Sequence, residues 1–275
     1  MFCSRTFLVR LFLLAVCEVL FCPHGLLAQT SAAEQVQVNP PPMRRAKPPA
    51  PDATPEVLEQ QGDELRGSKL FLDSLDYYNA ALAKSANNYR IVNKMGIAQL
   101  QMQRWKEARK CFERSIKANR DYADAYNNLG VVYYEEKNYG KAIKQYQKAI
   151  ALQDSSASFY SNMGAAYFSR KDFPKAVDAY AHALQLDPDV FERTSRIGVS
   201  AQLPSPEDRA YYDYVVAKLY AKMGVTDRSL EYLKKAMEEG YKKIDDVYKD
   251  AEFAELRKDP RFTELMKAKP PAITE

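Results

Sequence analysis

The sequence predicts an all-α fold in which antiparallel helix hairpins stack into one array. Glycines recur at a fixed interval, and the same alternation of bulky and small residues surrounds each of them. The composition, 46% hydrophobic and 28% charged, is that of a folded protein. A repeat of this length cannot bury its own apolar face, so neighbouring units must pack together. The glycines, spaced 34 residues apart, are Gly62, Gly96, Gly130 and Gly164.

The first segment, residues 1–28, has the pattern of a signal peptide. Arg5 and Arg10 form a basic start, and a mostly apolar run follows. An uncleaved membrane anchor is the alternative, although Glu18 interrupts the run and leaves it shorter than the roughly 20 residues that span a bilayer. The sequence therefore predicts an exported protein, periplasmic or secreted, whose mature chain begins near Gln29.

Residues 29–54 are rich in proline and contain almost nothing large to bury, so we expect a disordered linker. Its basic residues Arg44, Arg45 and Lys47 could make a weak contact with an anionic membrane surface. The alternative is that these charges are simply solvated.

Four repeats follow the linker. In each, the glycine lies inside the first helix, where it costs about 0.5 to 1 kcal/mol relative to alanine. Close packing must offset that cost, because a densely packed interior admits a bulky ring only where the facing helix presents a small residue. The four repeats are expected at 55–88, 89–122, 123–156 and 157–190. The residues expected to pack them are Gly62, Gly96, Gly130, Gly164, Ala108, Ala142, Ala176, Tyr146 and Tyr180.

The third and fourth units contain the segments "AYNNLGVVYY" and "SFYSNMGAAYF". With the 34-residue period, they resemble the tetratricopeptide repeat (TPR) family, whose signature has tryptophan, leucine, glycine and tyrosine at set places. The resemblance covers residues 55–190. The first two units match less well, and Gln99 in the second occupies a place where the third and fourth units have an aromatic ring. It implies a right-handed superhelix of antiparallel hairpins that is used to bind proteins or peptides.

Beyond the four repeats the pattern breaks and then resumes. Residues 191–204 lack the apolar spacing of a helix pair, so we expect an irregular insertion. Residues 205–243 predict a fifth TPR-like hairpin, since Ser205 and Pro206 form a typical helix start. Residues 244–275 are expected to form capping helices and a tail that cover the apolar end of the array.

The resemblance also implies a partner-binding groove, because the family lines the inner wall of its superhelix with set places on the first helices. These places are spaced three or four residues apart and share one helical stripe. The alternative is that they merely face solvent. The corresponding and adjoining residues are Arg90, Asn93, Asp124, Asn127, Asn128, Val131, Tyr134, Ser158, Ser161, Asn162 and Phe168.

Few residues suit catalysis. After removal of the signal peptide the chain retains one histidine, His182, and one cysteine, Cys111. The sequence therefore predicts no metal site, no cofactor and no enzyme activity. A net charge of +4 is too small to indicate a nucleic-acid binder.

These observations predict a non-catalytic scaffold or adaptor of the cell envelope, which holds a peptide or protein segment in the concave groove. The alternative is a self-assembling structural component that forms a homo-oligomer through its ends or its outer face.

Overall fold

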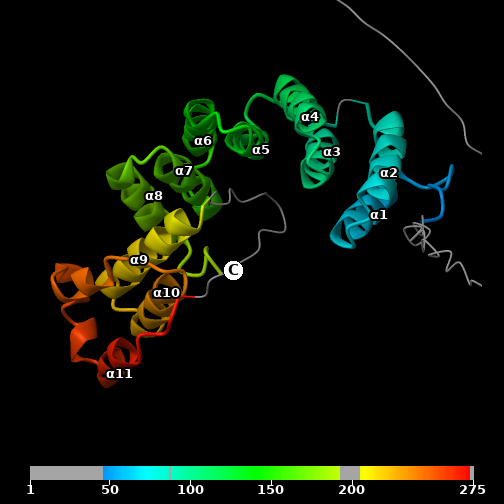
Figure 1. Ribbon diagram of the computed structural model, residues 1–275. Coiled ribbons are helices and arrows are strands. Elements are labelled where there is room, and N and C mark those ends of the chain that lie inside the picture. The colour runs from blue at the N-terminus through cyan, green and yellow to red at the C-terminus, as the bar shows by residue number, and fades with distance from the viewer. Residues whose placement is uncertain (1–45, 87, 193–204, 273–275) are drawn as a thin grey trace, which may run out of the picture. The chain divides into compact units, whose positions relative to one another are not determined.

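The computed structural model describes residues 46–86, 88–192 and 205–272, which contain helices and no strand (Figure 1). Consecutive helices pair as antiparallel hairpins, and each hairpin packs against the next. The predicted all-α hairpin array is confirmed. The expected signal peptide, residues 1–28, lies outside the described residues.

The first four hairpins follow one another with short turns. Each has a first helix of 13 residues and a second of 14. They are α1 (Pro55–Gly67) with α2 (Phe71–Lys84), α3 (Tyr89–Gln101) with α4 (Trp105–Ala118), α5 (Ala123–Glu135) with α6 (Tyr139–Leu152), and α7 (Ala157–Ser169) with α8 (Phe173–Leu186).

The fifth hairpin and the C-terminal segment complete the array. Ser205 caps the fifth hairpin's first helix by accepting a hydrogen bond from the Asp208 amide at 3.1 Å. The helices are α9 (Pro206–Lys222), α10 (Thr226–Glu238) and α11 (Pro260–Ala268). The 3-10 turns between the last two are η1 (Ile244–Tyr248), η2 (Ala251–Phe253) and η3 (Leu256–Lys258).

In each of the first four hairpins, a glycine of the first helix lies directly against an aromatic ring of the second helix. A Cβ atom placed on Gly130 would lie 2.5 Å from the Cε1 atom of Tyr146, closer than carbon atoms can approach. The ring is fully buried, so it has little room to move. The same contact recurs between Gly62 and Tyr78, Gly96 and Phe112, and Gly164 and Tyr180.

The turn inside every hairpin contains one residue in the left-handed conformation. In the third hairpin this is Lys137, with φ of 58°, and the Asn138 amide donates back to the Tyr133 carbonyl at 2.8 Å. This bond closes the last turn of the first helix. Gly224, with φ of 75°, holds the same place in the fifth hairpin, where a residue without Cβ adopts the conformation at no steric cost. The other residues at this place are Lys69, Gln103 and Lys171.

Part of the predicted linker is held against the first hairpin. The Tyr77 hydroxyl donates to the Lys47 carbonyl at 2.9 Å, and the Ala46 amide donates to Asp73 at 3.1 Å. Lys84 also bonds the carbonyl of Pro51 at 2.6 Å. The expectation of disorder is therefore wrong for residues 46–54, because polar groups of α2 fix a backbone that has few apolar side chains of its own.

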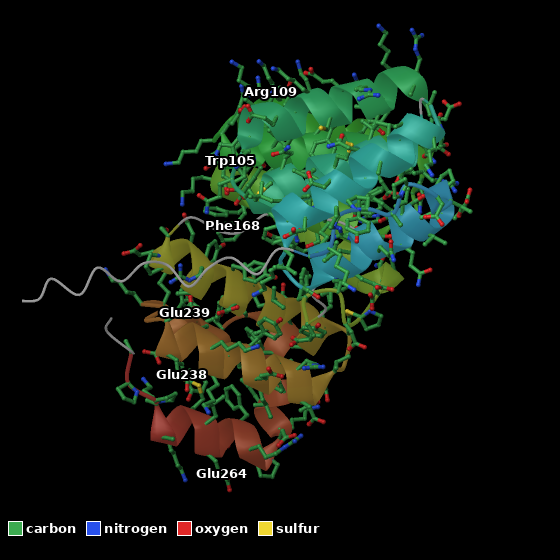
Figure 2. All side chains as sticks on the ribbon, turned by 90° about the vertical axis from the view of Figure 1, so that its right-hand side faces the viewer. Trp105, Arg109, Phe168, Glu238, Glu239 and Glu264 are labelled. Carbon is green, nitrogen blue, oxygen red and sulfur yellow. The ribbon has the colours of Figure 1, made fainter. Side chains whose placement is uncertain are left out.

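The C-terminal segment packs on the fifth hairpin. Phe253 is fully buried, and Leu256 and Phe262 are each 3% exposed within the apolar cluster formed with α9 and α10. Arg257 donates to the carbonyls of two preceding residues and so fixes the path of the 3-10 turns. Glu264, by contrast, points away from the packed helices (Figure 2).

Replacement of Gly130 by alanine tests the glycine–ring contact. We expect Gly130→Ala to lower the free energy of unfolding by roughly 1 to 3 kcal/mol, because the new methyl group must displace the Tyr146 ring. Gly140→Ala is the matched control, since nothing lies within 4 Å of its Cβ position. Thermal unfolding followed by circular dichroism measures both, and an unchanged midpoint for Gly130→Ala would contradict the contact.

The Tyr146 hydroxyl is buried and has no hydrogen-bond partner among the residues that the structure describes. Because a desolvated hydroxyl without a partner destabilises the fold, Tyr146→Phe should leave the free energy of unfolding unchanged or raise it by about 1 kcal/mol. Tyr78→Phe should lower it, since the Tyr78 hydroxyl donates to Asp63 at 2.7 Å and accepts from Arg66 at 3.2 Å. Chemical denaturation of the two variants measures the difference, and equal losses would rule this account out.

Candidate functional site

Most of the expected groove residues lie in the interior. They were expected to be free of packing, and this expectation is wrong for seven of them. The physical reason is the close approach of successive first helices, which contact one another as well as their own partners. The seven buried residues, each at most 4% exposed, are Asn93, Asn127, Asn128, Val131, Tyr134, Asn162 and Phe168.

Asparagine side chains link three successive first helices. Asn128 of α5 donates to the side-chain oxygen of Asn93 on α3 at 3.1 Å. On the other side of α5, Asn162 of α7 donates to Asn127 at 2.9 Å, and Asn127 donates to Asn128 at 3.3 Å. Buried amides must be hydrogen-bonded, so this series of asparagine hydrogen bonds fixes the register of the helices and does not present the amides to a ligand.

The aromatic residues of the expected groove also serve packing. The Tyr134 ring lies 5.2 Å from the ring of Tyr139, and its hydroxyl is 2.9 Å from Ser169 on the next first helix. Burial raises the pKa of Tyr134, so this hydroxyl stays protonated. The Phe168 ring packs edge-on to Phe173 at 5.1 Å.

Four of the expected groove residues retain contact with solvent. Arg90 is exposed, and its guanidinium lies 5.6 Å from the ring centre of Tyr89. Asp124, Ser158 and Ser161 are half-buried. The accessible polar surface on these first helices is therefore small.

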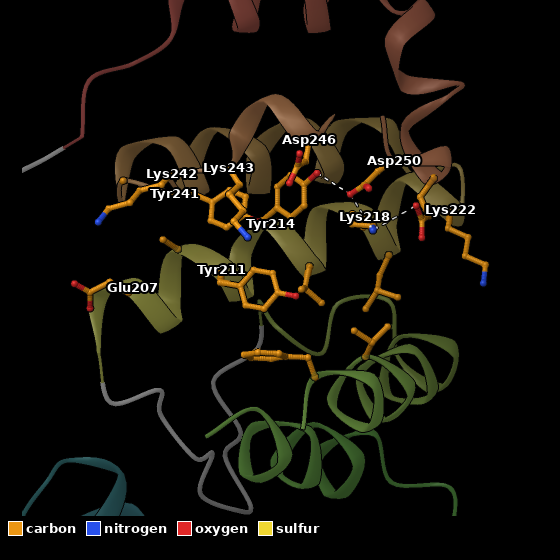
Figure 3. Close-up of a pocket in the computed structure, with 17 residues that line it drawn as sticks. Glu207, Tyr211, Tyr214, Lys218, Lys222, Tyr241, Lys242, Lys243, Asp246 and Asp250 are labelled. Atoms are coloured by element: carbon orange, nitrogen blue, oxygen red, sulfur yellow. Dashed lines mark hydrogen bonds and ion pairs between the residues drawn. The ribbon is translucent and has the colours of Figure 1, made fainter. Parts of the chain in front are cut away.

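A larger accessible site lies beside the fifth hairpin. A cavity of about 750 Å³ opens between α8, α9, the turn after α10, and the turns η1 and η2 (Figure 3). This volume is within the range of pockets that hold ligands. Its wall includes Phe173, Val177, Tyr211, Tyr214, Lys218 and Tyr241.

Tyrosine rings form one wall of this cavity. The Tyr241 ring stacks on Tyr214 with centroids 4.5 Å apart and on Tyr211 at 5.8 Å. Phe173 of α8 meets Tyr211 edge-on at 4.8 Å. Such rings offer large apolar faces whose polar ends remain available for hydrogen bonds.

An ion network fixes the other side of the cavity. Lys218 pairs with Asp250 at 2.9 Å and with Glu252 at 3.4 Å, and the Tyr214 hydroxyl donates to Asp250 at 2.8 Å (Figure 3). Burial disfavours the charge on Lys218, but its bonds to the two carboxylates outweigh burial and raise its pKa. Burial likewise opposes the charge on Asp250, yet bonds from Lys218 and Tyr214 lower its pKa. Lys218 and Asp250 are therefore ionised at neutral pH.

Sequence reasoning missed this site although a signal was present. The small residue of the fifth hairpin's first helix is Ala217, which corresponds to Gly164. Counted from Ala217, the places that line the inner wall in the family fall on Tyr211, Tyr214 and Lys218, all of which line the cavity. Extension of the inner-wall stripe past residues 191–204 to α9 would have identified these three residues.

The remaining reactive side chains do not form a catalytic constellation. His182 stacks on Tyr160 with ring centres 5.4 Å apart, and burial raises the pKa of the Cys111 thiol. Within the described ranges, no group of three or more histidine, cysteine, aspartate or glutamate residues could hold a metal ion. No helix among the same residues is long and apolar enough to cross a membrane.

Comparison with known families identifies the array. Two family models, both described as tetratricopeptide repeat, match the chain, one over residues 93–157 and the other over residues 157–190. The chain is a tetratricopeptide repeat protein. The matched segment runs from α3 to α8, the region of the buried asparagines. Tetratricopeptide arrays stack into extended binding surfaces, and this chain is a protein-interaction scaffold of that kind.

Three solved structures similar to this TPR protein have TM-scores below 0.5. A MamA protein shares 21% sequence identity over 72% of this chain and 95% of its own, with a TM-score of 0.46. MamA from Desulfovibrio magneticus RS-1 shares 18% identity over 67% and 93%, with a TM-score of 0.47. YrrB, a TPR protein with an unusual peptide-binding site, shares 18% over 66% and 84%, with a TM-score of 0.43. No curated protein matches the chain.

The fifth hairpin of the TPR protein also buries a carboxyl group. Asp213 of α9 is 7% exposed. Burial and the negative charge of Glu239 raise the pKa of Asp213 to about 7, although Lys235 and Arg209 act in the opposite direction and Glu192 adds a further negative charge. The carboxyl group is therefore close to half-protonated at neutral pH.

Because the pKa of Asp213 is higher in the folded state than in the unfolded chain, ionisation opposes folding. Its contribution to stability is fully present below about pH 4 and is lost as the pH rises through 7. We expect Asp213→Asn to match the wild type at pH 4 and to exceed it at pH 8, by at most about 4 kcal/mol. Urea unfolding across this range measures the effect, with exposed Asp154→Asn as control. Parallel profiles for wild type and Asp213→Asn would contradict the burial of an ionisable carboxyl.

Proposed function

We propose that this TPR protein is a non-catalytic adaptor of the cell envelope that holds a peptide or protein segment on its first-helix face, with the cavity of the fifth hairpin as the main contact. The observation that carries the proposal is the accessibility of the cavity. Tyr211, Tyr214 and Lys218 line it, whereas two of the three corresponding residues of α5, Asn127 and Val131, are buried.

The chemistry of the cavity supports binding over catalysis. Its tyrosine rings provide area for apolar contact, and rings of this kind are enriched among the residues that dominate protein interfaces. Its central lysine is paired with two carboxylates that raise its pKa, so the amine stays protonated and cannot act as a general base. The site offers shape, apolar surface and hydrogen bonds.

The location in the envelope rests on the sequence of residues 1–28. Removal of residues 1–28 during export would leave one cysteine, Cys111, in the mature chain. Packing, and no internal disulfide, would then stabilise the array.

Capture of partners from the native envelope tests the proposal. We expect Tyr241→Ala to lose the proteins that the wild type captures, because it removes the ring that stacks on both other tyrosines of the wall. Tyr248→Ala is the matched control, since this tyrosine is 53% exposed and does not line the cavity. The TPR protein itself should be recovered from the envelope fraction, with an N-terminus near Gln29.

Circular dichroism and the unfolding midpoint check that both variants remain folded. Equal capture by the wild type and Tyr241→Ala would remove the cavity from the function. Recovery of the chain from the cytoplasm with its first residues intact would remove the envelope role.

A further inference from the structure

We propose that the cavity of the fifth hairpin selects an acidic segment of a partner protein that inserts one large apolar or aromatic side chain between the tyrosines. This inference rests on the proposed function and adds the chemistry of the partner. It is carried by the composition of the cavity wall and by the distribution of unpaired charge around the opening.

The interior of the cavity favours an apolar side chain. Val177 and Phe173 face it from α8, and Val215 and Leu219 face it from α9. The stacked tyrosines close another side. A large inserted side chain would remove its own surface and these groups from water, which is the main source of affinity at such contacts.

Three acidic groups of the wall are already paired. Asp250 and Glu252 share Lys218. Asp246 pairs with Lys249 at 3.3 Å. These carboxylates therefore present little free negative charge to an incoming segment.

Three lysines at the opening of the cavity, which form its rim, are not paired. Lys222, Lys242 and Lys243 are exposed and have no ion pair with any other residue that the structure describes. Glu207 is the acidic lining residue without an ion partner in that same part of the chain. Unpaired positive charge therefore exceeds unpaired negative charge around the opening.

The positions of these lysines suit an extended segment. Figure 3 shows Lys222 at one end of the cavity and Lys242 with Lys243 at the other. A segment that anchors one side chain in the centre would bring its flanking residues toward both ends. Acidic flanks would meet lysines on each side, whereas basic flanks would be repelled. Exposed charge pairs add less affinity than the buried anchor, but they set selectivity and the rate of association.

Short synthetic peptides test this inference on the chain purified from the envelope. Each peptide carries a central tryptophan, leucine or alanine between runs of glutamate, glutamine or lysine. Fluorescence anisotropy should show the acidic tryptophan and leucine peptides binding at least about tenfold more tightly than the acidic alanine peptide. They should also bind about three- to tenfold more tightly than the glutamine series, with the difference shrinking as salt increases.

Charge variants separate the rim from the bulk charge of the protein. The triple change Lys222→Gln, Lys242→Gln and Lys243→Gln should abolish the preference for glutamate over glutamine flanks and leave the preference for tryptophan over alanine. A control with the same change in net charge uses exposed lysines of α4. It consists of Lys106→Gln, Lys110→Gln and Lys117→Gln, and should bind as the wild type does.

The outcomes distinguish this inference from the proposed function. If partner capture depends on Tyr241 but flank charge has no effect on peptide binding, the acidic partner is wrong and the adaptor stands. If no peptide binds, or if vesicles of anionic lipid bind in place of peptides and their binding is lost in the rim variant, the peptide partner is wrong. If capture is also independent of Tyr241, the cavity is not the site at which the adaptor binds its partner.

Discussion

The structure depends on the close contact, in each of the first four hairpins, between a glycine of the first helix and an aromatic ring of the second. With the nearest ring atom 2.5 to 2.6 Å from the Cβ position, no larger residue fits without displacing the ring. The contact brings the two helices of each hairpin together, and its repetition at a constant interval gives successive hairpins the same geometry. Identical units can then bury one continuous core, which a single hairpin is too small to form.

Close packing has a consequence for where the protein can bind. Between α3 and α7 the first helices approach so closely that asparagine amides bond across them and most of the intervening stripe is buried. Between the fourth and fifth hairpins α8 contacts α9 less extensively than α6 contacts α7. The same stripe therefore opens there into a cavity, and regular packing and accessible surface exclude one another along the array.

The 34-residue period predicted the array of helix hairpins because it reflects local spacing and contacts between adjacent units. It did not predict the burial of Asn127 or Phe168, since their exposure depends on the distance between successive first helices, which no single repeat encodes. The same stripe, extended to α9, predicts only part of the cavity wall. Tyr241 and Asp250 belong to the turns after α10, where no repeat template specifies a place, so only the folded chain brings them to α9.

The helix α9 has ion-paired side chains on the face toward the cavity and a buried carboxyl group, which titrates near neutral pH, on another face. Toward the cavity, Lys218 and Tyr214 meet Asp250, so each charge has a partner and the geometry of the wall is held. On another side of the helix, Asp213 is buried near Glu239 and Glu192, and its carboxyl group is favoured in the neutral form. Paired charge keeps the binding wall constant over the neutral pH range, whereas the carboxyl under the fifth hairpin makes the stability of that hairpin depend on pH. Changes in pH would therefore act on the element that carries the cavity while leaving the chemistry of its wall intact.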